Sequence, residues 1–108
     1  MINQYLIVLE KSETGFSAYS PDVLGCIATG QSLEETTTAM ELALTKHLAD
    51  QDSLPQPRGI DAYLDALQNS EGETFYLTHL SVDHLRALIL QDRTANGLRA
   101  SGRKIKMG

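Results

Sequence analysis

The 108-residue sequence has a single cysteine, no tryptophan and three prolines. Its apolar runs, such as residues 6–9, fall far short of the roughly 20 residues that a membrane-spanning helix needs. The N-terminus has no basic region followed by an apolar stretch and a cleavage site, so we expect neither membrane insertion nor Sec-type export. A lone cysteine cannot form an internal disulfide, which excludes a small secreted disulfide scaffold and favours a reducing cytoplasm.

The common catalytic motifs are also missing from the sequence. It has no Gly-rich phosphate loop, no G-x-S-x-G elbow, no H-E-x-x-H helix and no paired C-x-x-C. Cys26 has no histidine near it in sequence, so it is interpreted as a small buried hydrophobe rather than a nucleophile. His47 has no partner at a recognisable ligand spacing and is interpreted as a residue at a helix C-terminus. We therefore expect no enzyme, no cofactor and no metal.

Charge is divided unevenly along the chain, whose net charge is −5. Up to Leu85 there are 13 acidic and 3 basic residues, a balance of −10, whereas from Arg86 onward there are 6 basic residues and 1 acidic residue, a balance of +5. The acidic body repels nucleic acid and suits a basic protein partner, or it serves solubility alone. We expect one domain over residues 1–92 and a basic, flexible tail over residues 93–108.

The tail offers four bases for nucleic-acid contact, namely Arg99, Arg103, Lys104 and Lys106. These bases would contact phosphate groups without sequence preference. Alternatively, the tail docks on an acidic surface or is simply solvated. About 15 Gly-interrupted residues after Arg93 are too few for a complete DNA-binding module.

The first 30 residues are typical of a three-stranded antiparallel meander. Residues 2–10 are predicted to form a central strand buried on both faces, because the run is short and β-branched at its centre. A polar turn over residues 11–15 leads into a half-buried strand over residues 16–20. After the break at Pro21, a short third strand over residues 26–29 is closed by Gly30.

The rest of the chain is predicted to be helix, linker, helix, strand and helix. Ser32 and Glu35 form an S-x-x-E capping box, which begins a helix running to about Ala49. Five apolar residues of this helix follow helical spacing, namely Leu33, Met40, Ala43, Leu44 and Leu48. Residues 50–59 contain two prolines and are interpreted as a linker.

After the linker, a short helix is predicted from the spacing of four large apolar residues, namely Ile60, Tyr63, Leu64 and Leu67. Residues 73–80 are predicted to form a strand paired to the existing sheet, with Phe75, Leu77 and His79 on one face. Ser81 would then cap a last helix that runs to about Arg93.

One stretch of the sequence resembles the HicB antitoxin family. The family pattern is Gly-aromatic, then Pro-Asp, Gly-Cys, Gly, and a helix start with paired glutamates. This sequence matches it with Gly15-Phe16-Ser17-Ala18-Tyr19-Ser20-Pro21-Asp22, Gly25-Cys26, Gly30 and Ser32-Leu33-Glu34-Glu35. The resemblance covers about the first 57 residues. It departs from the pattern at Leu24, where the family often has proline, and at Thr36, which replaces alanine.

The resemblance implies an α+β protein with a partial, degenerate ribonuclease H-like fold, which is consistent with the element order derived above. It also implies a cytoplasmic antitoxin that binds and occludes a small basic HicA-type toxin, a ribonuclease that cleaves mRNA. Tyr19, Pro21 and Asp22 are the predicted toxin-binding residues, because they lie where the second strand ends. The alternative is that Pro21, Asp22 and Gly25 are only turn residues.

Two further functions remain open on the sequence. A solitary HicB-like module without a toxin would bind RNA or act in regulation through its basic tail. A metal-dependent nuclease would use Glu10 and Asp22, but residues 5–9 supply no carboxylate in the middle of the first strand, so we expect no hydrolysis. An open sheet with an edge strand also predicts a homodimer or a higher homo-oligomer, through edge pairing or helix packing.

Overall fold

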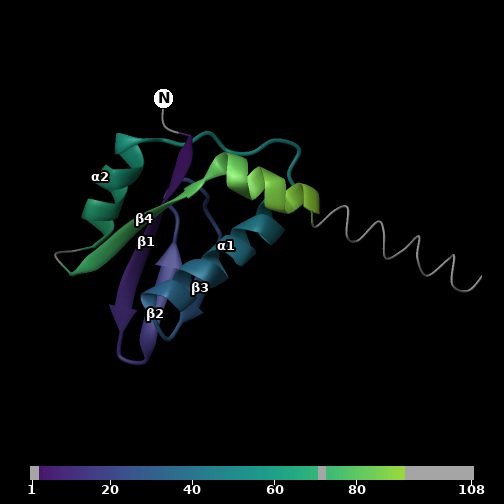
Figure 1. The fold of residues 1–108 in the computed structure, drawn as a ribbon. Helices are drawn as coiled ribbons and strands as arrows, with labels where there is room; N and C mark the ends of the chain where they lie inside the picture. Colours follow the sequence, from purple (N-terminus) through teal and green to yellow (C-terminus); the bar gives the residue numbers. More distant parts are fainter. Residues whose placement is uncertain (1–2, 71–72, 92–108) are drawn as a thin grey trace, which may run out of the picture.

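The computed structural model describes residues 3–70 and 73–91. Their fold is a four-stranded antiparallel sheet with helices on both faces (Figure 1). The elements follow the order β1 (Gln4–Ser12), β2 (Gly15–Tyr19), β3 (Ile27–Gly30), α1 (Leu33–Ala49), α2 (Ile60–Asn69) and β4 (Phe75–Ser81). Residues 82–91 continue as a further helix to the end of the described residues, and we refer to them as the C-terminal helix. The predicted tail, residues 93–108, lies outside the described part of the chain.

The strand order in the sheet is β3-β2-β1-β4, so β1 is central, as predicted. β1 pairs with β2 through the hairpin and with β4 from the far end of the chain, and its partners include Val8 opposite Tyr19 and Val8 opposite Leu77. Successive side chains of a strand point to opposite faces of the sheet. Both sets are buried in β1, because helices cover both faces of the sheet at this strand. Its position and its apolar sequence therefore agree.

One face of the sheet carries the larger core. Tyr5, Ile7 and Leu9 of β1 pack there with buried residues of α1 and of the C-terminal helix. α1 contributes Met40, Leu44 and Leu48, and the C-terminal helix contributes Val82, Leu85 and Ile89. The predicted stripe of α1 is confirmed at its centre, although Leu33 at its start is 37% exposed.

α1 begins as the capping sequence predicts. The Ser32 side chain accepts a hydrogen bond from the backbone N–H of Glu35 at 3.0 Å. Thr36 is fully buried, and its hydroxyl donates to the Ser32 carbonyl at 2.6 Å. A Cβ added at Gly30 would lie 2.6 Å from the Thr36 hydroxyl oxygen, so the end of β3 has room only for glycine beside this helix.

α2 packs on the opposite face of the sheet, against Leu6 and Val8 of β1. The linker reaches that face along the end of β1, where the Tyr5 hydroxyl donates to the Pro55 carbonyl at 2.7 Å. The predicted helix is confirmed, but its buried face is not the one that the large apolar residues indicate. Ala62 and Ala66 are fully buried, whereas the four large residues are 42–72% exposed. Small side chains allow the helix backbone to approach the sheet closely, which leaves the larger ones outside.

β4 and the C-terminal helix complete the fold. The Ser81 hydroxyl accepts the backbone N–H of His84 at 3.2 Å, so the predicted cap is present. The predicted helix end near Arg93 falls outside the described residues. Among the helices that the structure describes, none is both long enough and apolar enough to cross a membrane.

Candidate protein-interaction site

Two of the three predicted site residues, Pro21 and Asp22, lie where α2 begins, and Asp22 makes the most contacts there. Its two carboxylate oxygens accept hydrogen bonds from the backbone N–H groups of Leu6 and Arg58, each at 2.7 Å. These two donors come from distant parts of the chain. Its own N–H donates to the Ser20 hydroxyl at 3.1 Å. Asp22 is 7% exposed, so its charge is held inside the protein by these donors. Asp22 thus ties the β2–β3 loop to β1 and to the start of α2.

Arg58 forms a second connection at the same place. Its guanidinium donates to the Pro21 carbonyl at 3.1 Å and pairs with Asp65 of α2 at 2.6 Å. The hydrogen bond to Asp65 raises the pKa of Arg58 above its ordinary value, and the charges of Asp65, Asp22 and Asp61 act in the same direction. Gly59 follows with φ of +65°, a left-handed conformation that glycine adopts without strain. The chain therefore turns into α2 at a fixed point on the β2–β3 loop.

Tyr19 lies on the face of the sheet that carries α2, near Asp65 and Asn69 in the second half of that helix. Its hydroxyl is buried and makes no hydrogen bond of good geometry within the described residues. The pKa of Tyr19 lies above its ordinary value, mainly because of burial. The charges of Glu10 and Asp65 raise this pKa further, whereas the Asn69 side chain acts in the opposite direction. These neighbours place one side of α2 next to β2. We call this side, formed by Asp61, Asp65, Glu10 and Tyr19, the acidic flank.

The other side of α2 faces β4. A groove of about 350 Å³ runs there between Ile60 and Tyr63 of α2 and Leu77 and His79 of β4. Leu6, Gln4, Gly59 and Asp22 also line it. Leu67 lies on the same side of α2 as Ile60 and Tyr63, since helix positions three, four and seven apart share a face. We call this surface, formed by Ile60, Tyr63, Leu67, Leu77 and His79, the apolar flank.

The structure thus gives the three predicted residues different surroundings. Tyr19 is half-buried at the acidic flank, while Pro21 and Asp22 are buried. The chain does not turn outward after the second strand, because backbone donors and Arg58 hold the loop at Pro21 and Asp22 against the protein. Contact of these residues with a toxin stays a prediction, and Pro21 and Asp22 are placed to position α2. The four predicted tail residues lie outside the described residues.

Sequence reasoning missed the two flanks of α2. The signal was present, because Ala62 and Ala66 are four residues apart and share one helix face. Their small size concealed it, since large apolar residues are the usual guide to a buried helix face.

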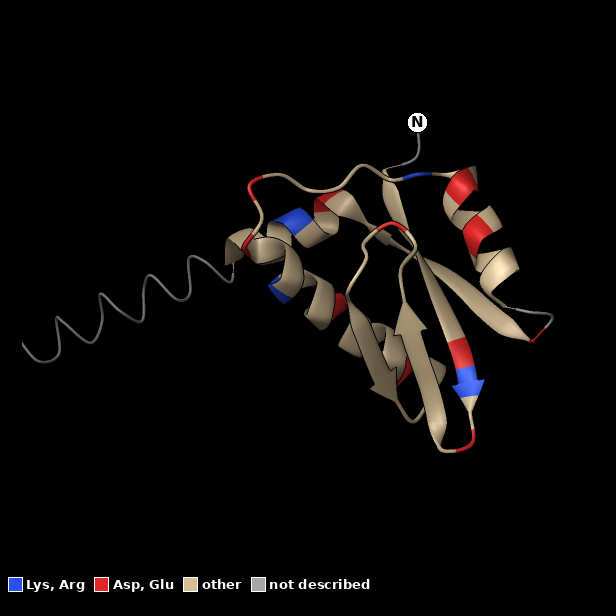
Figure 2. Ribbon diagram, turned by 180° about the vertical axis from the view of Figure 1, so that it is seen from behind, with Lys and Arg blue, Asp and Glu red and all other residues tan. Residues whose placement is uncertain are grey.

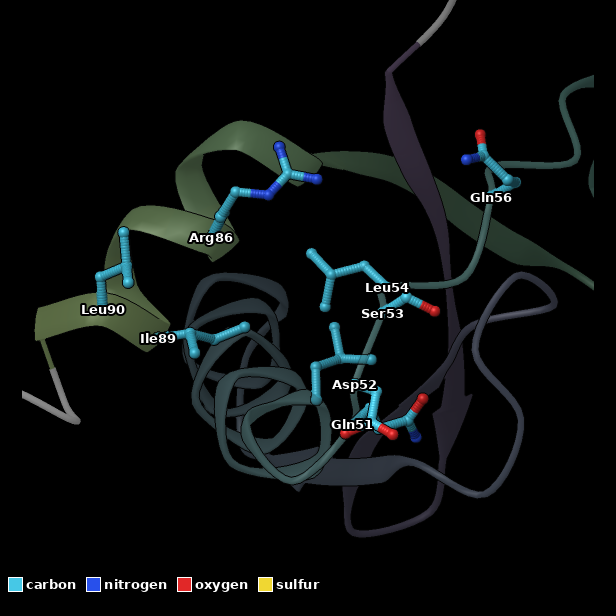
Figure 3. Close-up of a pocket in the computed structure, with 9 residues that line it drawn as sticks. Gln51, Asp52, Ser53, Leu54, Gln56, Arg86, Ile89 and Leu90 are labelled. Atoms are coloured by element: carbon cyan, nitrogen blue, oxygen red, sulfur yellow. The ribbon is translucent and has the colours of Figure 1, made fainter.

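A second cleft, of about 380 Å³, lies on the other side of the molecule between the linker, the end of α1 and the C-terminal helix. Ile89 and Leu54 point into it from opposite sides, and Arg86 reaches across from the C-terminal helix (Figure 3). Its lining combines amide, hydroxyl and apolar side chains with the charged side chains of Asp52 and Arg86. Because the cleft adjoins the end of the described residues, we assign it no site.

The residues considered for catalysis do not assemble a reaction centre. Asp22 contacts the backbone at Leu6, and Glu10 is four residues further along β1, about 13 Å away at strand spacing. Within residues 3–70 and 73–91, no group of three or more His, Cys, Asp or Glu residues is arranged to hold a metal ion. Cys26 is buried, and burial raises the pKa of its thiol. This environment fits a small core residue.

Comparison with known proteins assigns the chain to a class. Residues 5–92 match the model of the HicB-like antitoxin family of bacterial toxin–antitoxin systems. The chain belongs to this family. An uncharacterised 14.9 kDa protein from the rep–hol intergenic region of Haemophilus phage HP1 (strain HP1c1) is 31% identical over 83 residues, which are 73% of this chain and 60% of the phage protein.

Two solved structures share the fold. The crystal structure of antitoxin HicB3 has a TM-score of 0.61 at 25% identity, and the match covers 73% of this chain and 61% of that one. A chain of the HicA3–HicB3 toxin–antitoxin complex has a TM-score of 0.56 at 27% identity, and the match covers 70% of this chain and 93% of that one. This chain therefore spans about three fifths of the phage protein and of the HicB3 chain.

Proposed function

We propose that this protein is an antitoxin that binds a small basic HicA-type toxin, a ribonuclease that cleaves mRNA, and inhibits it by occlusion. The family and the similarity to a chain of a HicA3–HicB3 complex support a toxin partner. The observation that carries the proposal for this chain is the acidic flank, where α2 presents Asp61 and Asp65 above a sheet surface that includes Glu10 and Tyr19.

The acidic flank also has apolar neighbours on which a partner would pack. Ile27 of β3 pairs with Tyr19 of β2 and so lies on the same face of the sheet, where it is 70% exposed. Leu24, in the preceding loop, is 80% exposed. Exposed apolar residues next to charges provide the packed centre and polar rim of a protein interface. In this arrangement Tyr19 contacts the toxin, and Pro21 and Asp22 act as positioning residues for α2.

Charge favours a basic partner over nucleic acid. Acidic positions recur along the described part of the chain, and few basic positions lie among them (Figure 2). The balance up to Leu85 is −10. A field of this sign speeds the encounter with a basic protein, and it weakens as salt screens it. Buried apolar contacts would supply most of the residence time of the complex.

The test begins by capturing partners of the tagged chain from its native host with ribonuclease treatment. A small basic protein that remains bound in stoichiometric amount is then purified and assayed for mRNA cleavage with and without an equimolar amount of this chain. We expect suppression of cleavage. Asp61→Lys should weaken binding by about tenfold, because it reverses a charge at the acidic flank. Asp52→Lys, an equal change at an exposed linker position, is the matched control.

Two results would contradict the proposal. One is a captured toxin that cleaves mRNA equally well in the presence of this chain. The other is a loss of binding in Asp52→Lys with none in Asp61→Lys.

The second candidate function is a solitary HicB-like module that binds RNA or acts in regulation through its tail. The charge balance of +5 from Arg86 onward is the observation that favours it. The two functions predict opposite results when residues after Asp92 are deleted. Toxin neutralisation should survive the deletion if the acidic flank binds, whereas RNA retention should be lost if Arg99, Arg103, Lys104 and Lys106 bind. A filter-binding assay at several salt concentrations measures the second outcome.

We further infer that the core is a partial, degenerate ribonuclease H-like fold without hydrolytic activity, in a cytoplasmic protein. The antiparallel β-β-β-α order and the absence of a carboxylate from residues 5–9 support this interpretation. Incubation of the pure chain with RNA and Mg²⁺ or Mn²⁺ tests it. Cleavage that is lost in Glu10→Gln would establish the nuclease function instead.

A further inference from the structure

The two edges of the sheet differ in how they are protected. β3 is an edge of only four residues. β4, the other edge, has seven residues, Phe75–Ser81, and none is charged, proline or glycine. Within the described residues, no strand pairs with its outer side. Natural proteins usually protect an edge with charge, proline or short length, because free backbone groups recruit another strand. β4 has none of these protections.

The apolar flank lies directly above this edge. In β4, Leu77 pairs with Val8 and His79 pairs with Leu6, so both residues are on the face that carries α2. Across the groove, Ile60 is 72% exposed and Tyr63 is 42% exposed. A strand added beside β4 would satisfy the free backbone groups and place every second side chain beneath α2. Edge and flank therefore form one surface for strand addition.

We propose that a second copy of this chain occupies this surface, with β4 pairing antiparallel to β4 of the second copy. Such a contact is two-fold symmetric and joins the two sheets into one. Charge is the reason for choosing a second copy as the occupant. Residues up to Leu85 carry a balance of −10, so two copies repel each other over most orientations. β4 and the apolar flank carry no Asp, Glu, Lys or Arg, and Asp22, which also lines the groove, is only 7% exposed, so this surface allows close approach.

A basic toxin is favoured elsewhere, because it gains electrostatic energy at the acidic flank and none here. The two sides of α2 thus divide two kinds of recognition. The acidic flank suits a partner of opposite charge, and the apolar flank with the β4 edge suits an identical partner.

The dimensions of the surface indicate how stable the dimer is. β4 is about 24 Å long at strand spacing, and α2 is about 15 Å long at helix rise. A contact of these dimensions buries less surface than the roughly 800 Å² per partner that a standard stable interface buries. We therefore expect a reversible dimer with a dissociation constant in the micromolar range.

Sedimentation equilibrium of the full chain over about 1 to 200 µM is the first test. We expect the mean mass to rise with concentration from 11.8 kDa toward twice that value. Leu67→Glu and Leu77→Glu should each raise the dissociation constant at least tenfold, because the symmetry places two added charges in one interface. Leu42→Glu is the matched control, since Leu42 is a 57% exposed leucine on α1. Circular dichroism checks that each variant is folded.

Disulfide trapping tests the position of the contact independently. Single cysteines are placed at residues 76–80 of β4, and Cys26 does not interfere because it is buried. Opposite residues of paired antiparallel strands have Cβ atoms about 4.5–5.5 Å apart, so crosslinking should be strong at one or two of these positions, where the strands cross the symmetry axis. Leu42→Cys should give none.

Several outcomes would overturn the proposal. They are a monomer at every concentration, a dimer that only Leu42→Glu weakens, or equal crosslinking at all sites. A further one is a monomer whose binding of a basic protein is lost in Leu67→Glu, since the apolar flank would then hold that partner instead. Neutralisation of a toxin is measured separately, so failure of the dimer leaves the proposed antitoxin function standing.

Discussion

Replacing Asp22 by alanine is the perturbation that most directly tests how α2 is held on the sheet. The substitution removes both acceptors of the Leu6 and Arg58 backbone N–H groups, each bonded at 2.7 Å. A hydrogen bond to a charged group contributes roughly 1.5–3 kcal/mol, and a buried donor left without a partner costs about as much. The expected loss in the free energy of unfolding is therefore about 3–5 kcal/mol. Domains of this size are stable by only about 5–15 kcal/mol, so the loss is a large part of the total.

Urea unfolding followed by circular dichroism measures this loss. Asp22→Asn keeps one acceptor and should lose less than Asp22→Ala. Asp52→Ala, at an exposed position in the linker, should change stability by less than about 0.5 kcal/mol. Hydrogen exchange adds a local measurement, since the Arg58 amide should lose protection in Asp22→Ala. A loss below about 1 kcal/mol, with the Arg58 amide still protected, would refute the view that this carboxylate holds α2 in place.

Three further predictions follow from burial. Cys26 should react with iodoacetamide at least about a thousandfold more slowly in the folded protein than in urea, because burial shields the thiol and raises its pKa; a fast reaction in buffer would contradict its placement in the core. Burial also raises the pKa of Tyr5 and Tyr19 in the folded state, so the unfolded chain loses these protons first, and stability should decline as the pH rises above about 10. Urea midpoints between pH 7 and 11 measure this, and a rising midpoint would show the sign to be wrong. Finally, Ala62→Leu should cost about 1–3 kcal/mol by pushing α2 off the sheet, whereas the exposed Leu64→Ala should cost little; equal effects in urea unfolding would exclude close packing at Ala62.

Much of the fold was predictable because its signals are local. The Ser32 cap, the break at Pro21 and the short apolar run over residues 6–9 each fix an element or its boundary through neighbouring residues. The central place of β1 also followed from its burial on both faces. The same reasoning identified the family, and the match over residues 5–92 agrees with it.

The site was less predictable because its contacts connect distant residues. Asp22 bonds to groups 16 and 36 residues away, which no short pattern contains. Helical spacing found α2 but not its orientation, since it located a stripe of large residues while the two alanines decided which side met the sheet. Recognising the acidic and apolar flanks therefore required the positions of β2 and β4 as well as the helix.

The place of β4 in the sheet has a consequence for the order of events in folding. One of the two neighbours of β1 in the sheet, β4, comes from residues 75–81, about 70 positions later in the chain. Contacts of such large sequence separation slow folding, because a long loop must close before they form. Until β4 is in place, the edge proposed for self-association is absent and Leu77 has not reached the groove. Self-association through this edge is thus restricted to molecules whose sheet is complete, which makes assembly a check on folding.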